Sequence, residues 1–325
     1  MKTALCALLC AAALFSMPVA AENHDYPNKP ITLVVPFPAG SPTDTAARIA
    51  AQILTDQLNQ TVVVDYKSGA SGTIASRHIA RAEPDGYTLL ATSSSTHVAA
   101  PAVMSLPYDA EKDFTAISPV ARTDIVVVGR SDLSATNLKD LIETIRSKPG
   151  GLTYASSGEG TVLHLSGALF EAGIGGQLVH VPYRGAAPAA VDLIGGQVDL
   201  MFDTVSNVRQ NVLNGRLKAY AVLSHERAKA LPDVPSVDEL GLAHLSVPTV
   251  WLGLMGPAGM SDKVIKTLTD ALQKGIKTPA IQERLDGAAL QADVLESKAF
   301  TERNREARKV YTKLAQESGL AINKK

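Results

Sequence analysis

The stretch most suited to binding chemistry is a turn of small and polar residues between a predicted strand and a predicted helix. Residues 31–35 are mostly apolar and β-branched, which is typical of a buried strand, and residues 36–44 follow them. Ser41 can cap the next helix, Pro42 suits its first position, and Asp44 stands three residues after Ser41, as in a capping box. Free backbone N–H groups at a helix N-terminus can bind an anion. A well-capped helix without a ligand fits this turn equally well.

Similar turns recur where other predicted strands end. Small, hydrogen-bonding residues follow strand-like runs at 69–72, 92–96 (including Ser93 and Ser94), 156–161, 182–188 and 203–204. In open α/β sheets, ligands bind outside the carboxyl ends of the strands. These recurring turns together therefore predict a polar cradle for a small ligand.

The chain carries no recognisable catalytic, metal or nucleotide motif. Its seven histidines never pair at the close spacing of a helical zinc site. Residues 69–73 nearly form a nucleophile elbow, but Thr73 stands where the motif needs glycine. The glycine pair at 158 and 160 does not complete a dinucleotide fingerprint, because Leu163 replaces its last glycine. His164 fits a site residue or a helix-packing histidine equally well. The sequence therefore favours a binding protein over an enzyme, with no cofactor.

Residues 1–21 read as a secretory signal, with a basic start, a short apolar run and small residues before a predicted cleavage after Ala21. No later stretch reaches about 18 uninterrupted apolar residues, so no other membrane segment is expected. Cys6 and Cys10 both lie in this signal, which leaves the mature chain without thiol chemistry. Lipid attachment at Cys10 is disfavoured because the apolar run continues through Phe15. The predicted location is the periplasm.

Charge and the spacing of elements limit the classes of protein that remain. The 31 basic and 32 acidic residues give a net charge of −1, which argues against the basic face that nucleic-acid binding needs. A repeated strand–loop–helix rhythm predicts an α/β protein with parallel sheets. Breaks near residues 117–122 and 231–248 suggest that the chain crosses twice between two lobes. The predicted lobes are 22–122 plus 245–325, and 123–244; tail helices at about 262–277 and 298–318 are expected on the first.

Short motifs run through the whole mature chain in a fixed order. They are residues 35–40 with Asp44 and Arg48, 84–89, 106–109 with 112–114, 156–158 with His164 and Leu165, 181–185, 195–199, 231–235 and 257–259. In this order they resemble the Bug, or TctC-like, extracytoplasmic solute receptors of tripartite tricarboxylate transporters. The resemblance implies a two-lobed periplasmic binding protein of type II topology with a hinge between its lobes.

The same resemblance implies how the protein works. A small carboxylate would be held between the lobes by backbone amides, hydroxyls and water, and a monomeric receptor would deliver it to the membrane subunits of the transporter. A periplasmic sensor that feeds a signalling system would share this fold, and a secreted hydrolase would need a nucleophile and base that the sequence does not reveal. The implied ligand-binding residues are Phe37, Pro38, Ala39, Gly40 and Asp44 in the first lobe, and Ser156, Ser157, Gly158, Thr161, His164, Tyr183, Arg184, Gly185 and Asp203 in the second. Ser41 departs from the family, which usually has a second glycine there.

Overall fold

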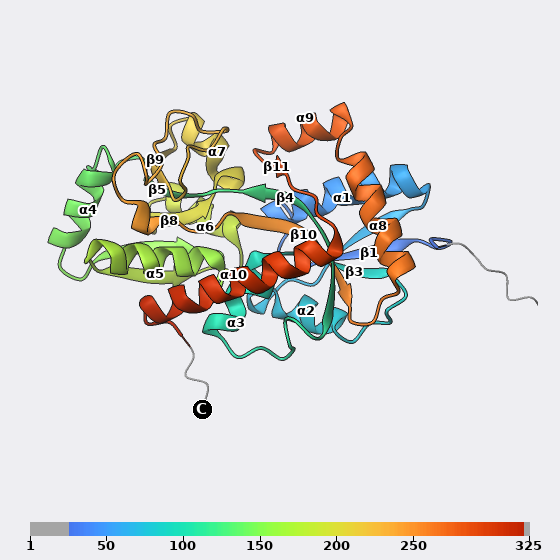
Figure 1. The fold of residues 1–325 in the computed structure, drawn as a ribbon. Helices are drawn as coiled ribbons and strands as arrows, with labels where there is room; N and C mark the ends of the chain where they lie inside the picture. Colours follow the sequence, from blue (N-terminus) through green and yellow to red (C-terminus); the bar gives the residue numbers. More distant parts are fainter. Residues whose placement is uncertain (1–25, 322–325) are drawn as a thin grey trace, which may run out of the picture.

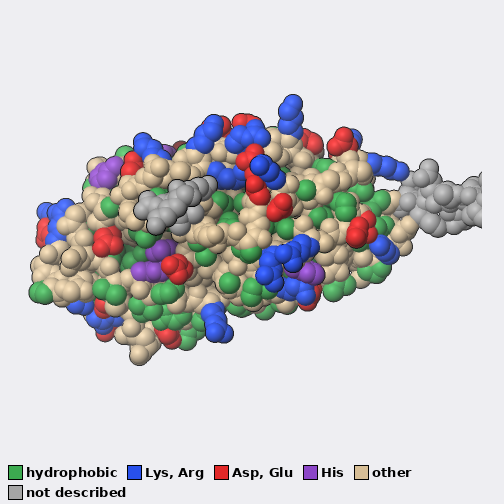
Figure 2. All heavy atoms as spheres, turned by 90° about the horizontal axis from the view of Figure 1, so that it is seen from below, with side chains coloured by type: hydrophobic (Ala, Val, Ile, Leu, Met, Phe, Trp, Pro, Cys, Tyr) green, Lys and Arg blue, Asp and Glu red, His purple; other side chains and the backbone are tan. Residues whose placement is uncertain are grey.

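The computed structural model describes residues 26–321, which form two α/β lobes side by side (Figure 1). The predicted signal, its cleavage after Ala21 and both cysteines lie outside the described residues. Among the helices of residues 26–321, none combines the length and apolar content needed to cross a bilayer. Acidic and basic side chains are interspersed over the face shown in Figure 2, which agrees with the nearly balanced charge of the chain.

The first sheet has the strand order β11–β4–β10–β3–β1–β2. Its strands are β1 (Ile31–Val35), β2 (Val62–Tyr66), β3 (Thr88–Ser93), β4 (Phe114–Thr123), β10 (Val250–Pro257) and β11 (Gln291–Ala292). β1 lies parallel between β2 and β3, and four of its five residues are buried. This position explains the nearly continuous apolar character of the strand, since both of its faces are covered.

The second sheet has the order β7–β6–β8–β5–β9. Its strands are β5 (Ile125–Arg130), β6 (Leu152–Ser156), β7 (Leu178–Pro182), β8 (Leu200–Thr204) and β9 (Leu217–Val222). β6 lies parallel between β7 and β8. The carboxyl ends of these three strands lead into the turns at 156–161, 182–188 and 203–204, so the predicted polar turns share one edge of the sheet.

Each sheet also contains one strand that enters from the other lobe. β5 follows β4 after Asp124 alone and lies antiparallel between β8 and β9, while β10 lies antiparallel between β3 and β4. The expectation of purely parallel sheets is therefore wrong, because each crossing strand arrives from the opposite direction. If n denotes the crossing strand and the other strands of each sheet are numbered in chain order, both sheets contain the order 2-1-3-n-4, and the first sheet adds β11 beside its fourth strand. This is the type II arrangement that the resemblance implied.

The α-helices are α1 (Pro42–Leu58), α2 (Thr73–Ile79), α3 (Ala100–Val103), α4 (Leu138–Ser147), α5 (Val162–Ile174), α6 (Ala186–Ile194), α7 (Val205–Leu213), α8 (Asp262–Gly275), α9 (Pro279–Gly287) and α10 (Ser297–Glu317). A π-helical turn, η2 (Ser95–Ala99), follows β3. Of the two predicted tail helices, α8 packs on α1 and β4 of the first lobe. By contrast, α10 contacts β4 and η2 and also reaches α5 of the second lobe.

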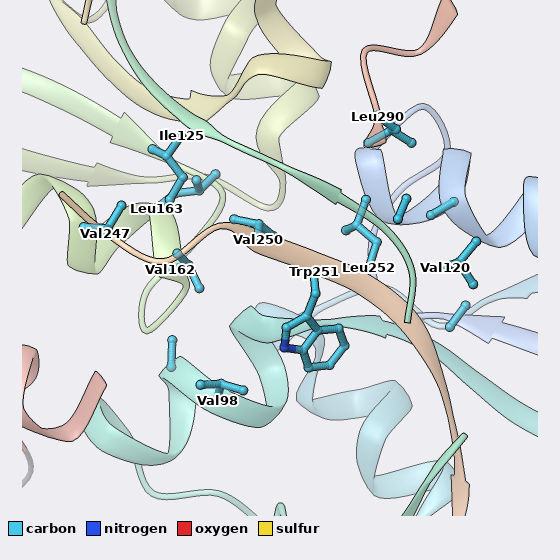
Figure 3. Packing of buried hydrophobic residues seen from close by; sticks show 14 of the residues in the cluster. Val98, Val120, Ile125, Val162, Leu163, Val247, Val250, Trp251, Leu252 and Leu290 are labelled. Carbon is cyan, nitrogen blue, oxygen red and sulfur yellow. The ribbon is translucent and has the colours of Figure 1, made fainter. Parts of the chain in front are cut away.

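Buried apolar side chains continue from one lobe into the other at the crossings (Figure 3). Val250 and Leu252 of β10 belong to the same cluster as Ile125 of β5 and Leu163 of α5. Each of these four side chains is nearly inaccessible to solvent. The crossing strands therefore share one apolar core.

Candidate functional site

The first predicted turn is fixed by a small network around Asp44. Ser41 caps α1, and its Oγ accepts a hydrogen bond from the Asp44 N–H at 3.2 Å. Asp44 Oδ2 accepts from the Gly40 N–H at 2.8 Å, one residue before the partner that a standard capping box would use. Asp44 Oδ1 accepts from the Tyr66 hydroxyl at 2.6 Å and from Arg48 Nε at 3.0 Å. Both carboxylate oxygens therefore hold the loop, α1 and β2 together.

A narrow cleft lies between the turns of the two lobes. Its walls are formed by Phe37, Ser41, Pro42, Thr43, Ser93, Ser95, Val250 and Leu252 from the first lobe and by Ser157, Leu163, Ala186, Asp203 and Thr204 from the second. The space open to the centres of water molecules is about 40 Å³. Pockets that hold small-molecule ligands usually measure about 300–1,000 Å³, so the lobes lie nearly closed on each other.

Five of the predicted residues lie in the cleft wall: Phe37, Ser41, Ser93, Ser157 and Asp203. The prediction missed the apolar part of the wall, to which Leu163, Val250 and Leu252 contribute. Val250 and Leu252 belong to the crossing strand β10, whose residues are all buried. Its place beside β3 depends on a long-range strand pairing, in which Leu252 is opposite Ser93.

Three predicted residues lie where the lobes touch. Gly158 has φ +135°, and a Cβ added there would lie 2.7 Å from Ser71 Oγ of the first lobe. A Cβ on Gly185 would lie 3.2 Å from Pro38 Cδ. The Val162 N–H donates to Ser95 Oγ at 3.3 Å, which joins the N-terminus of α5 to the first lobe. At position 158 the positive φ favours glycine, and an added Cβ would also crowd the Ser71 side chain of the opposite lobe.

The other predicted residues lie at the rim or behind the wall. Ala39, Gly40 and Arg184 are exposed, and the Tyr183 hydroxyl donates to Asp192 Oδ2 of α6 at 2.8 Å. Thr161 caps α5, and its Oγ1 accepts from the His164 N–H. Ser94 is buried, and its Oγ has no hydrogen-bond partner among the described residues.

Ser156 and His180 form a pair that superficially resembles a nucleophile and its base. Ser156 Oγ lies 2.7 Å from His180 Nε2, and the His180 ring stacks on His164 with centroids 3.9 Å apart. However, Ser156 is fully buried and lies outside the cleft wall, and within residues 26–321 His180 has no carboxylate partner to orient it. Burial lowers the pKa of His180 to about 4. The two imidazoles thus act as neutral supports of the 156–161 turn, and sequence reasoning did not single out His180.

The electrostatics of the cleft favour an anion. Residues at the N-termini of α1, α5, α6 and α7 all contribute to its wall, so the positive ends of these helices converge on one small space. Hydroxyl groups of Ser41, Thr43, Ser93, Ser95, Ser157 and Thr204 surround it. The wall residues include no Lys or Arg, and the one ionisable side chain among them is Asp203. Among the described residues, no His, Cys, Asp or Glu cluster is arranged to hold a metal ion.

Comparison with known proteins agrees with this architecture. Residues 46–320 match the family model described as the tripartite tricarboxylate transporter family receptor. The chain is 35% identical to Protein BugT of Bordetella pertussis over 282 residues, which cover 86% of each protein. Its structure resembles Rpa4515 of R. palustris with adipate (TM-score 0.88, 28% identity, covering 91% of this chain and 99% of that one). It also resembles MatC from Rhodopseudomonas palustris with bound malate (TM-score 0.84, 29% identity, covering 89% and 99%). The resemblance found in the sequence motifs is thus confirmed, and the chain belongs to the TctC family of periplasmic solute-binding receptors.

Proposed function

We propose that this chain captures a small organic carboxylate in the cleft between its lobes and delivers it to the membrane subunits of a tripartite tricarboxylate-type transporter. The observation that carries this proposal is the convergence of four helix N-termini and six hydroxyl groups on one interlobe cleft. The adipate and malate named with two structurally similar proteins are small dicarboxylates, and they support this ligand class.

The proposal assigns the two lobes to residues 22–122 plus 245–325 and 123–244, with the crossings as the hinge. Within it, the ligand is bound by the hydroxyl groups of the wall, by free backbone N–H groups of the four helices and by water. The apolar wall of β10 then faces the carbon chain of the ligand. The rim residues Ala39, Gly40 and Arg184 would approach the ligand only if the lobes change their separation.

Ligand screening by thermal shift, followed by calorimetry, tests the ligand class. The screen contains malate, adipate, other mono-, di- and tricarboxylates, and uncharged amides of the same size. At least one carboxylate is expected to bind at roughly micromolar strength, about −8 kcal/mol, and binding should survive a chelator. A folded protein that binds only the amides, or none of these compounds, would contradict the proposal.

The wall serine Ser157 provides the matched test of the site. Ser157→Ala is expected to weaken carboxylate binding about fivefold, because one neutral hydrogen bond contributes about 1 kcal/mol. Ser147→Ala, on the exposed face of α4, is the control and should bind like the wild type. Uptake of labelled ligand by vesicles that contain the transporter's membrane subunits, with and without the receptor, tests the delivery step separately.

A further inference from the structure

Asp203 is an unusual residue for a cleft that attracts anions. It lies at the carboxyl end of β8, lines the cleft, and is completely buried. Its Oδ1 accepts a hydrogen bond from the Thr204 N–H at 2.7 Å, and its Oδ2 accepts one from Asn207 Nδ2 at 2.5 Å. Oδ1 also accepts a hydrogen bond from the Thr204 hydroxyl at 3.4 Å, so of the about four lone-pair positions of the carboxylate the free one lies on Oδ2.

No opposite charge acts on Asp203. Burial raises its pKa to about 7, against the hydrogen bonds from Asn207 and Thr204, which favour the ionised form. The elements packed on β8 carry these charged or titratable groups: Arg130 on β5, Tyr154 on β6, His164 and Glu171 on α5, Asp192 on α6 and Arg209 on α7. Asp124 at the β4–β5 crossing, His180 on β7 and Arg184 before α6 lie on neighbouring segments. None of these groups is among the causes of the pKa shift. The protonation of Asp203 therefore depends mainly on whether water or a charged ligand occupies the cleft.

An incoming carboxylate and an ionised Asp203 would repel each other in a space from which water is largely excluded. Like charges at close range in a site of low polarity cannot both remain ionised, and one of the two carboxyl groups takes up a proton. A protonated Asp203 changes from an acceptor to a donor, and it can then donate a hydrogen bond to the ligand. The helix N-termini stabilise the negative charge of the ligand and leave Asp203 as the group that holds the proton.

We propose that Asp203 takes up one proton from solvent when the cleft binds a carboxylate, and that the neutral Asp203 donates a hydrogen bond to the ligand. This inference rests on the proposed function, because it concerns the ligand of the same cleft. It makes Asp203 a specificity-determining residue for anions and makes ligand capture dependent on pH. In the alternative role, an ionised Asp203 would bind an ammonium group of the ligand.

Calorimetry of malate and adipate in buffers of different ionisation enthalpy measures this proton uptake directly. The wild type is expected to take up close to one proton per ligand at pH 8.5 and close to none at pH 6. Its affinity should fall about thirtyfold between these pH values, because the unliganded carboxyl group ionises near pH 7. Asp203→Asn, which keeps the size and supplies an N–H donor, should abolish the proton uptake and bind equally at both pH values. Ser157→Ala should weaken binding while leaving the proton uptake unchanged.

Two results would overturn the proposal. One is carboxylate binding without proton uptake at pH 8.5; the other is loss of binding in Asp203→Asn at pH 6 although the variant is folded. If neither acid binds at either pH, the carboxylate-receptor function itself fails and the proposal fails with it. A ligand-free measurement remains decisive in that case. As the pH rises from 5 to 7, the unfolding temperature of the wild type should fall relative to that of Asp203→Asn. Above pH 8, the difference between the two unfolding temperatures should stay constant. Parallel curves would show that Asp203 holds no proton.

Discussion

Asp44, predicted as a ligand-binding residue, uses its carboxylate to hold the first loop. Its carboxylate accepts hydrogen bonds from Gly40, Arg48 and Tyr66 and lies outside the cleft wall, and its N–H donates to Ser41 Oγ. Asp44→Asn should therefore lower the free energy of unfolding by about 1–2 kcal/mol through the weakened hydrogen bonds, and leave ligand affinity unchanged. Denaturant titration and calorimetry check this, with the exposed Asp65→Asn as control. A variant of normal stability with much weaker binding would place Asp44 at the ligand instead.

The stacked imidazoles of His164 and His180 predict sensitivity to acid. Burial lowers the pKa of His180 to about 4, whereas an unfolded histidine ionises near 6.5, so the unfolded state binds more protons between these values. The stabilising effect of the neutral ring is complete above pH 6.5 and is lost as the pH falls towards 4. Denaturation at pH 4.5, 5.5 and 7 should show this decline as a loss of wild-type stability relative to His180→Gln as the pH is lowered, a comparison in which the opposite pH dependence of Asp203 cancels. Relative to His78→Gln, on the exposed face of α2, the wild type should show no such loss.

At the residue level, short-range contacts were readable from the sequence and long-range contacts were not. The cap formed by Ser41 and Asp44 spans three residues, and its hydrogen bond is present as predicted. The bond from Tyr66 to Asp44 depends on the pairing of β2 with β1, and the pair Ser156–His180 depends on the pairing of β6 with β7. Spacing along the chain carries no signal for such contacts.

The turns that carry small residues were predictable as elements, whereas the crossings were only partly so. The helix predicted to follow the Ser41 cap, with Pro42 at its first position, is α1, because the cap and the apolar spacing agree on its start. Local sequence patterns did not indicate α4, α9, β4 or β9. The antiparallel direction of β5 and β10 was missed, since direction depends on how the chain returns between lobes and not on local pattern.

Gly158 allows a prediction about the turn between β6 and α5. Gly158→Ala would place a Cβ 2.7 Å from Ser71 Oγ in the other lobe, at a backbone φ of +135°. The variant should bind ligand at least tenfold more weakly, because the contact exists only when the lobes meet. Gly175→Ala, at φ +63° with nothing within 4 Å of the added Cβ, controls for backbone strain. Adding Ser71→Ala to Gly158→Ala should restore part of the affinity. If the second change restores nothing, backbone strain and not the lobe contact explains the loss.

At the scale of the whole molecule, the structure shows lobes that nearly touch and a cleft of about 40 Å³. A second groove of about 480 Å³ also spans the two lobes, with Arg122, Asp124 and Arg209 among its walls. Residues 122–124 at the first crossing line this groove. A rotation of one lobe against the other about the crossings therefore changes the volume of the groove and of the cleft together. Trp251 lies between the cleft residues Val250 and Leu252, but its ring packs edge-on against Phe300 of α10 with centroids 4.8 Å apart. It therefore contacts the helix that links the lobes, and not the cleft.

A dicarboxylate cannot enter a cleft of this size, so the ligand-free protein in solution is expected to open about the crossings. Ligand stabilises the closed form only by its stronger binding to that form. Small-angle X-ray scattering should give a larger radius of gyration without ligand, and one that matches the present structure at saturation. Ser95→Ala, which removes the hydrogen bond from the Val162 N–H across the cleft, should shift the free protein further towards the open form and weaken binding. Because α10 contacts both lobes, Trp251 emission should change with the radius. Identical scattering with and without a bound ligand would show instead a rigid receptor, whose cleft admits its ligand by side-chain movement alone.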